Sequence, residues 1–370
     1  MVLVRIGSSE MGLGVQEPMR IAESAQTAGL PSGMPRHCVC YTPDQSYLFP
    51  TFVSAVQARR HTSRHLADIV IIAFGIDPVA AAVFAEACAR ADIRFMNRSE
   101  ADIHGAPAML ARLFLAELLP EHYEYFLYVD GDTQVEASLD DLLTMHLPHG
   151  MFRAAADPMT FACDDTDRHG RGIAAHFASL GLSPSEARRY FNTGVIHAER
   201  QGWARIGAEA WKLFSGKAGS RFPDQDVLNL VGLPYCLPMS LAWNFPAYMY
   251  NARVASLIGP RIVHYMAQPK PWNGAFPPWN HGGWKAYGEV AARFPETAPY
   301  WRRNGRAKWV RYHLQQRYRR VTETFTWALS VKRERILAYE RGLKQVESAQ
   351  EPPDRARSQP VLAPSVGASF

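Results

Sequence analysis

Two runs of consecutive apolar residues constrain most strongly what this chain can fold into. DIVIIAF (68–74) and EYFLYV (124–129) carry apolar side chains, many of them β-branched or aromatic, at nearly every position. A strand with one solvent-facing side would alternate apolar and polar residues, so these runs are typical of strands that are covered on both faces of a sheet. They predict an α/β fold in which helices flank a mostly parallel sheet.

Further predicted elements follow along the chain. Four other short apolar segments are expected to be strands: HCVCY (37–41), DIRFM (92–96), FNTGVIHA (191–198) and RIVHYM (261–266). Helical periodicity or composition predicts helices over 49–61, 79–91, 107–119, 202–214 and 223–231. The polar segment 158–189 is expected to be a loop. Because ligands of such sheets bind beyond the carboxyl ends of the strands, residues at those ends are candidates for chemistry.

Composition sets the general class of the protein. The 370 residues are 47% hydrophobic and 20% charged, which indicates a globular protein with a sizeable core. Apolar runs stay well short of the about 18 residues that a membrane span needs, and Arg5 and Glu10 lie where a secretory signal would be apolar. Five scattered cysteines show no paired metal-binding spacing and are expected to be reduced thiols. We therefore expect a cytoplasmic protein.

The positive charge is concentrated near the C-terminus. The net charge is +5, but segment 301–320 alone holds eight cations and no acid, which leaves about −3 for the remainder. Aromatic residues are interleaved with these cations over 301–345. This mixture suits peripheral attachment to an anionic membrane surface, at the inner face of the membrane. The alternatives are a solvated helical segment that packs its aromatics on the domain, or phosphate contacts to a nucleic acid.

Two acids follow the second apolar run directly. Asp130-Gly131-Asp132 places two carboxylates around a glycine, and both can reach one divalent cation because glycine has no side chain to crowd it. Oxygen ligands of this kind suit Mg²⁺ or Mn²⁺. A solvated turn would have the same composition, but the position at the end of a buried strand favours a metal site.

Residues from the second half of the chain can complete such a site. His264 ends a predicted strand and would favour Mn²⁺ as a third ligand, because imidazole is softer than carboxylate. Lys270 could contact a phosphate oxygen. Asp224 and Asp226 lie at a predicted helix start, and Asn192 precedes an apolar strand. The alternatives are a core histidine, an exposed lysine and acids that only stabilise a helix N-terminus.

Taken in order, these residues resemble glycosyltransferase family 8, a family of retaining transferases. The resemblance runs from Cys38 to Trp272. The matching motifs are TPDQSY (42–47), ARLFLAELLP (111–120), LYVDGD (127–132), YFNTGV (190–195), DQDVLN (224–229), WNF (243–245) and HYMAQPKPW (264–272). The resemblance implies a GT-A-like nucleotide-diphospho-sugar transferase fold.

The resemblance also implies which residues hold the nucleotide-sugar donor. Asp44 and Tyr47 correspond to the pair that holds the uracil ring, and Arg112 to an arginine near the donor. Asp157 corresponds to an acid that contacts the donor sugar, and Lys270 to a lysine on the diphosphate.

The remaining matches concern the reacting atoms and the metal. Asn192, Asp224 and Gln225 correspond to residues around the reacting sugar, while Asp130, Asp132 and His264 correspond to the ligands of Mn²⁺ or Mg²⁺. The chain departs from the family pattern at Thr193, where alanine is usual, and at Ala267, where glycine is usual.

The expected activity is transfer of a hexose, with retention, from a UDP-sugar to a glycan or lipid-linked acceptor such as a lipopolysaccharide. The alternative is a catalytically silent relative that binds nucleotide sugar or acts as a scaffold. Nucleic acid is not an expected partner. The expected division is a loosely ordered leader (1–35), a catalytic domain (36–300), a basic helical tail (301–345) and a disordered end (346–370).

Overall fold

The computed structural model describes residues 35–215 and 222–350. Nearly all of the expected leader and of the expected disordered end lies outside these residues. A seven-stranded sheet has the strand order β3-β2-β1-β4-β7-β6-β8. Its strands are β1 (His37–Tyr41), β2 (Ala67–Phe74), β3 (Arg94–Arg98), β4 (Tyr125–Val129), β6 (Phe152–Ala156), β7 (Phe191–Glu199) and β8 (Cys236–Met239). Only β7 runs antiparallel to its neighbours β4 and β6, so the prediction of a mostly parallel sheet is confirmed.

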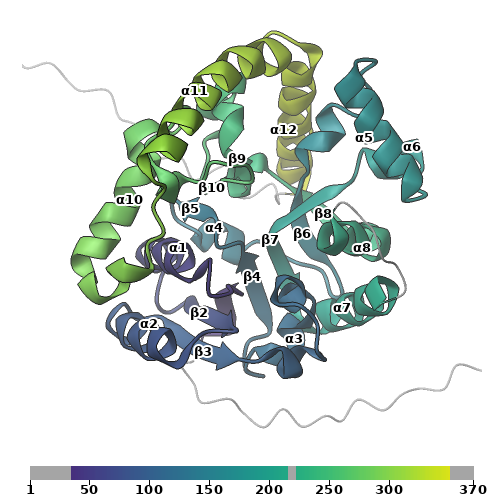
Figure 1. Ribbon diagram of the computed structural model, residues 1–370. Helices are drawn as coiled ribbons and strands as arrows, with labels where there is room; N and C mark the ends of the chain where they lie inside the picture. The colour runs from purple at the N-terminus through teal and green to yellow at the C-terminus, as the bar shows by residue number, and fades with distance from the viewer. Residues whose placement is uncertain (1–34, 216–221, 351–370) are drawn as a thin grey trace, which may run out of the picture. The chain divides into compact units, whose positions relative to one another are not determined.

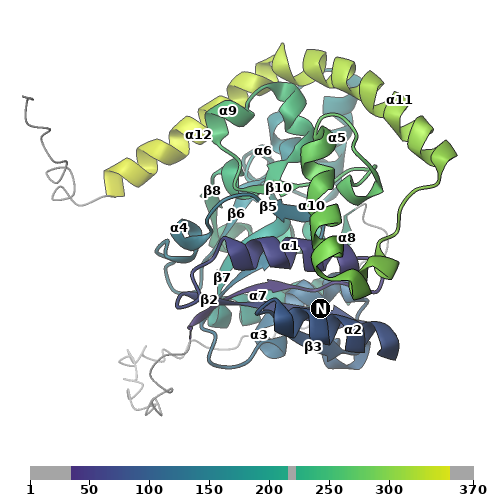
Figure 2. The same cartoon turned by 90° about the vertical axis from the view of Figure 1, so that its left-hand side faces the viewer.

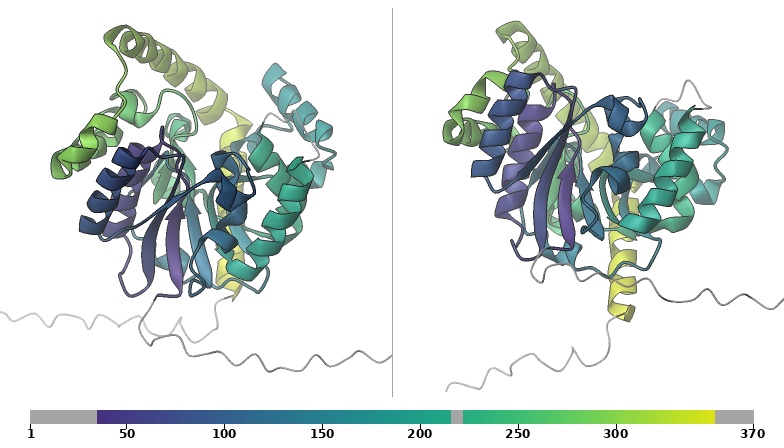
Figure 3. Two further views of the ribbon diagram at one scale, coloured as in Figure 1. Left: turned by 60° about the horizontal axis from the view of Figure 1, so that its bottom comes forward. Right: turned by 90° about the horizontal axis from the view of Figure 1, so that it is seen from below.

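Helices cover both faces of this sheet, as Figure 3 shows. One layer holds α1 (Leu48–Arg60), α2 (Pro78–Arg90) and α10 (Asn280–Arg293); the other holds η2 (Ala108–Phe114), α3 (Leu115–Leu118), α7 (Arg200–Ser215) and α8 (Pro223–Gly232). Strand β4 contributes Leu127 and Val129 to the first core and Phe126 and Tyr128 to the second. The unbroken apolar run of β4 therefore reflects burial on both sides.

A second, smaller sheet lies beside the first and joins distant parts of the chain. It consists of β5 (Thr133–Val135), β10 (Ile262–His264) and β9 (Phe245–Pro246), in the order β5-β10-β9. Antiparallel pairing aligns His264 with Thr133. Because β5 begins directly after Asp132, this pairing brings the histidine to the acid pair.

The C-terminal helices pack on the domain. Helix α11 (Arg306–Glu323) leads through a π-helical turn, η9 (Thr324–Ala328), into α12 (Val331–Gln350), and these elements cross the molecule beside β8, β9 and β10 (Figures 1 and 2). From α12, Tyr339 donates a hydrogen bond to the Met239 carbonyl (2.7 Å), and Glu340 accepts one from the Leu241 N–H (2.8 Å). The prediction of a helical C-terminal segment is confirmed, and the segment is part of the folded body.

Three local predictions need correction. The expected helix over 107–119 is mostly 3₁₀ (η2), and the Trp203 indole donates a hydrogen bond to its Arg112 carbonyl (2.8 Å). The expected loop 158–189 contains η3 (Pro158–Phe161), α5 (Arg168–Ser179) and α6 (Pro184–Ala187). Helix α5 begins where Asp167 accepts a hydrogen bond from the Gly170 N–H (2.7 Å). Strand β3 starts two residues later than predicted, after Asp92 with φ of 58°.

The α-helices of the described residues that have not yet been named are short: α4 (Asp140–Leu143) and α9 (Ala255–Ile258). Among the described residues, no helix combines the length and the apolar character that crossing a bilayer requires. The five cysteines all lie within the described residues and are free thiols.

Candidate active site

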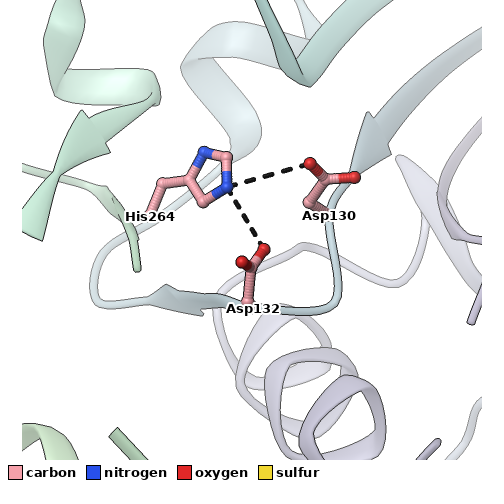
Figure 4. Close-up of side chains that lie close together, drawn as sticks. All are labelled: Asp130, Asp132 and His264. Carbon is pink, nitrogen blue, oxygen red and sulfur yellow. Dashed lines mark ion pairs between the residues drawn. The ribbon is translucent and has the colours of Figure 1, made fainter. Parts of the chain in front are cut away.

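Three side chains converge at the carboxyl end of β4 (Figure 4): Asp130 and Asp132 from the loop between β4 and β5, and His264 from the end of β10. The Nε2 atom of His264 lies 3.2 Å from Oδ1 of Asp132 and 3.8 Å from Oδ2 of Asp130. One ligand atom from each of the three residues falls within 4.8 Å of the others. This separation lets the three atoms face one ion.

Each carboxylate uses one oxygen for the protein and directs the other at the imidazole. Oδ1 of Asp130 accepts a hydrogen bond from the Tyr128 hydroxyl (2.6 Å) and pairs with Arg112 (3.0 Å). Oδ2 of Asp132 accepts from the Lys270 ammonium (2.6 Å). The two remaining oxygens face Nε2 of His264. Two anionic oxygens and an imidazole nitrogen form a donor set that suits Mn²⁺.

The tautomer of His264 follows from a chain of amide groups. The Gly194 N–H donates to Oδ1 of Asn192 (3.0 Å), which fixes the orientation of that side chain. The same oxygen accepts from Nδ2 of Asn244 (2.8 Å), so Oδ1 of Asn244 must face Nδ1 of His264 (2.9 Å). An amide oxygen only accepts, so Nδ1 carries the proton. In the neutral form of the ring, the lone pair is therefore on Nε2, the atom that faces the two acids and could bind a cation.

Glycines make room for this convergence. A Cβ atom at Gly194 would lie 2.2 Å from Cε1 of His264 and 2.9 Å from Oδ2 of Asp130. A Cβ atom at Gly131 would lie 2.0 Å from Oγ1 of Thr51 on α1. Gly131 was predicted to leave room for a cation, but the space beside it is taken by the Thr51 side chain.

The residues expected around the reacting sugar form one buried network. The Asn192 amide donates to Oδ2 of Asp157 (3.0 Å) and to Oε1 of Gln225 (3.0 Å), and the Gln225 amide donates to the same Asp157 oxygen (3.1 Å). The other Asp157 oxygen accepts from the Met159 N–H (2.9 Å). Burial raises the pKa of the Asp157 carboxyl. These contacts hold the amides at one wall of the site.

Arg112 joins the acid pair to Asp224. Its guanidinium lies 3.0 Å from Asp130 and 3.5 Å from Asp224, and it donates to Oγ1 of Thr193 (3.1 Å). Burial alone would lower the pKa of Arg112, but Asp130 and its other anionic neighbours raise it above its usual value. The threonine that replaces the family alanine thus holds the arginine.

Lys270 is buried against the acid pair. Its ammonium donates to Asp132 and to the Tyr265 carbonyl, each at 2.6 Å. Burial alone would raise the pKa of Asp132 and lower that of Lys270. The attraction between the two charges outweighs burial, so the carboxyl pKa lies well below its usual range and the ammonium pKa above it. In this arrangement Lys270 lies within reach of any group bound to the acids.

Two cavities meet at Asp130 and Asp132. One, of about 240 Å³, is lined by Asp44, Tyr47 and Arg112, three of the residues expected to hold the donor. The other, of about 420 Å³, is lined by Asp157, Asn192, Gln225 and His264. All eleven predicted site residues therefore lie in or beside one continuous region. Within it, Oδ1 of Asp44 caps the turn at Ser46 and Tyr47.

Some residues of the candidate site were not predicted from the sequence. Asn244 lies within the WNF motif but had no role assigned to it, and nothing local marks it as the partner of a histidine 20 residues away. Tyr128 was recoverable, because side chains two apart on a strand share a face and Tyr128 precedes Asp130 by two. Tyr190 donates to Asp226. Trp327 lines the larger cavity, although it lies far along the C-terminal segment.

Comparison with known proteins identifies the family. The model of glycosyl transferase family 8 matches residues 38–275, which is more than half of the chain. The chain belongs to glycosyl transferase family 8. The match ends before α10, so the C-terminal helices lie outside the part that this family model describes.

One relative of known function is similar over about half of its length. Lipopolysaccharide 1,2-glucosyltransferase of Escherichia coli (strain K12) is 23% identical over 178 residues, 45% of this chain and 49% of the relative. The match thus spans about half the length of that curated relative.

Solved structures show the GT-A-like fold. The galactosyltransferase LgtC, in complex with donor and acceptor sugar analogues, matches with a TM-score of 0.54 and 22% identity over 70% of this chain and 95% of its own. The bifunctional glycosyltransferase WbbM matches with a TM-score of 0.57 and 18% identity over 74% of this chain and 52% of its own. At these identities the likeness establishes the fold.

Proposed function

We propose that this protein is a metal-dependent, retaining hexosyltransferase that uses a UDP-hexose donor and a glycan or lipid-linked acceptor. The observation that carries the proposal is the convergence of Asp130, Asp132 and His264 at the point where two cavities meet. A transferase binds a donor and an acceptor next to each other, and two cavities that adjoin at the acid pair could hold them.

A divalent cation, Mn²⁺ in preference to Mg²⁺, would be held by these three side chains and would neutralise charge on the departing diphosphate. Lys270 is placed to exchange its contact with Asp132 for a phosphate oxygen. The smaller cavity would take the nucleotide, with the uracil ring against Tyr47, whose own ring packs edge-on against Trp272 at 5.6 Å.

Retention is expected to proceed by substitution on one face of the sugar. A covalent sugar–enzyme intermediate needs a free nucleophile, but Gln225 is a neutral amide. The Asp157 carboxylate accepts three hydrogen bonds, and Asp224 pairs with Arg112. We propose that these groups orient sugar hydroxyls and that the acceptor proton passes to the leaving phosphate. Detection of a glycosyl-enzyme adduct by mass spectrometry would contradict this mechanism.

The test is release of UDP from UDP-glucose and UDP-galactose with Mn²⁺ and without any acceptor. We expect slow release that chelation abolishes and that Asp132→Asn lowers by at least about 100-fold, since the metal contributes several kcal/mol to charge stabilisation. The matched control is Asp141→Asn, an exposed acid that pairs with Arg261 and should leave the rate unchanged. Equal rates in the two variants would refute the proposal.

A second candidate is a nucleotide-sugar-binding relative without transferase activity. The contact of Lys270 with Asp132 favours it, because an ammonium already neutralises one of the metal ligands. The same experiment separates the two candidates: UDP and UDP-hexose would bind, but no UDP would be released from the donor with any divalent cation.

We also propose that α11 attaches the protein to the inner face of the membrane. An exposed apolar stripe follows the helical period along this segment: Val310, Leu314, Tyr318, Val321 and Phe325. Exposed arginines border the stripe, with Arg311 on one side and Arg306 and Arg317 on the other. This combination suits an anionic bilayer.

Point substitutions test the attachment better than truncation, because deleting the segment would also remove the buried Trp301 and Trp327. Leu314→Ser with Phe325→Ser should reduce sedimentation with phosphatidylglycerol vesicles several-fold. Val79→Ser, at an exposed apolar residue on α2, is the control and should change nothing. Undiminished sedimentation of the double variant would contradict the assignment.

A further inference from the structure

The larger of the two cavities has a mixed lining. Polar groups line it, among them His169, the metal-site residues and the Asn192 and Gln225 amides. The same lining also includes apolar and aromatic side chains: Met159, Ile173, Phe222, Tyr248 and Trp327. A volume of about 420 Å³ lies within the range of small-molecule sites, about 300–1,000 Å³. Polar and aromatic groups in one cavity match a ligand with hydroxyls and an apolar face.

Among the described residues that line this cavity, Trp327 alone comes from beyond the family match. It lies in the π-helical turn η9, where the Leu329 N–H bonds to the Thr324 carbonyl at 3.2 Å. Such turns interrupt helices rarely and are frequent at functional sites. Phe325, two residues earlier, is exposed, whereas Trp327 is 9% exposed and lines the cavity. The two aromatic side chains therefore lie on opposite sides of this turn.

The position of this ring is fixed by its neighbours. The ring centroid of Tyr248 lies 5.8 Å away, and the Lys332 ammonium lies over the indole at 5.7 Å. Lys332 in turn pairs with Asp165 at 2.7 Å, and Arg335 pairs with the same carboxylate at 2.7 Å. These charges tie α12 to the segment just before α5, the helix that contributes Ile173 to the cavity lining. A wall held this way costs little ordering when a ligand binds.

We propose that the acceptor is a pyranose-containing glycan whose terminal ring binds in this cavity, with a face of C–H groups against Trp327 and Tyr248. A pyranose chair presents such a face, and the electron-rich face of an aromatic ring attracts polarised C–H groups. The acceptor hydroxyl then points toward the amides and the acid pair. This inference rests on the proposed function, and it assigns to the C-terminal helices the recognition of the acceptor.

The kinetic test uses methyl β-D-glucopyranoside and methyl β-D-galactopyranoside as probes in the Mn²⁺-dependent UDP-release assay. We expect a glycoside to accelerate UDP release by the wild type. Trp327→Ala should raise the half-saturating glycoside concentration about tenfold, whereas Trp327→Phe should retain most of the response. Trp309→Ala, at a partly exposed tryptophan of α11 outside the cavity, is the matched control and should behave as the wild type.

A binding measurement makes the result independent of catalysis and of how well the alanine variant folds. In protein labelled with 5-fluorotryptophan, the ¹⁹F resonance that is missing from Trp327→Phe should shift when a glycoside is added. Met159→Ala, at another residue of the cavity lining, should weaken that shift. An unmoved resonance together with a wild-type response of Trp327→Ala would overturn the proposal. A shift with octanol but not with glycosides would also overturn it, since the wall would then bind alkyl chains. If the wild type releases no UDP at all, the proposed function fails, and the resonance still tests the cavity.

Discussion

The Oδ1 atom of Asn244 lies 2.9 Å from Nδ1 of His264, and this contact decides which ring nitrogen faces the acid pair. The orientation of Asn244 is inherited from Asn192, which is itself oriented by the backbone N–H of Gly194. A main-chain group on β7 thus sets the tautomer of a side chain on β10. We infer that the YFNTGV motif supports the metal site as well as the sugar site.

The first prediction concerns Asn244. In Asn244→Ala the imidazole loses the acceptor that keeps its proton on Nδ1, so Mn²⁺ affinity should fall about 10- to 100-fold, the usual effect of removing a partner of a metal-bound histidine. Isothermal titration calorimetry with Mn²⁺ measures the change. Asn251→Ala, which removes a hydrogen bond to Glu323 away from the site, should leave the affinity unchanged. Equal affinities in both variants would show that the contact does not matter.

Gly194 gives a steric prediction. The methyl group of Gly194→Ala would overlap His264 and approach Asp130, so the histidine must move out of the site. We expect Mn²⁺ affinity to fall by more than about 100-fold, beyond the effect of losing a supporting residue. Gly172→Ala, where nothing lies within 4 Å of the added atom, should bind Mn²⁺ normally and gain up to about 1 kcal/mol of stability in α5. Normal Mn²⁺ binding by Gly194→Ala would contradict the geometry.

Lys270→Met should affect two ligands in opposite directions. Without nucleotide, the ammonium competes with a cation for Asp132, so its removal should tighten Mn²⁺ binding several-fold. With Mn²⁺ saturating, the variant should bind UDP about tenfold more weakly, because a charged contact to phosphate is lost. Calorimetry with each ligand separates the effects. Weaker binding of both would mean that Lys270 only supports the fold.

Removing the buried cation of Arg112 should destabilise the protein. Arg112→Met leaves Asp130 and Asp224 without their shared partner, and loss of one member of a buried ion pair costs about 3–5 kcal/mol. Thr193→Ala removes a single hydrogen bond to the same guanidinium and should cost about 1 kcal/mol. Urea unfolding gives both values. A similar loss of stability in the two variants would show that the carboxylates of Asp130 and Asp224 are solvated.

The ion pairs of Asp165 with Lys332 and Arg335, which hold α12 on the domain, should weaken at low pH. Burial alone would raise the pKa of Asp165, but Lys332 and Arg335 lower it below its usual value. A lowered folded-state pKa adds stability that is present above the unfolded pKa of about 4 and is lost as pH falls below it. Hydrogen exchange in α12, corrected for intrinsic rates, should therefore accelerate near pH 3, and Asp165→Asn should show the faster exchange already at pH 7. The neighbouring Asp164→Asn, which affects a surface pair with Arg188, should not. Slow exchange at pH 7 in Asp165→Asn would show that these ion pairs do not hold α12.

The sequence predicts the fold, and the acid pair and histidine that converge in it, for a physical reason. Strand β4 is buried on both faces, so its apolar run is unbroken, and the acids that follow it stand out at the carboxyl end of a strand. His264 was predicted because it ends an apolar segment that matched a family motif. Both signals are local in the sequence.

Other features depend on contacts between distant segments. Asn244 reaches His264 because β9, only two residues long, pairs with β10, and so short a strand leaves no periodic pattern. The Arg112 carbonyl in η2 likewise accepts its hydrogen bond from Trp203 on α7, 91 residues along the chain. The predicted basic tail contains exposed aromatic residues such as Phe325 and buried ones such as Trp327. The sequence does not distinguish them, because burial here depends on tertiary packing.

Pulsed electron paramagnetic resonance of bound Mn²⁺ tests the central claim most directly. Asp130, Asp132 and His264 are proposed to hold one ion beside a diphosphate. With Mn²⁺ and UDP, echo modulation from one directly bound ¹⁴N nucleus should be present in the wild type and absent from His264→Gln. The wild type should also show coupling of Mn²⁺ to ³¹P of the UDP. Absence of nitrogen modulation in the wild type, or its persistence in His264→Gln, would contradict the account.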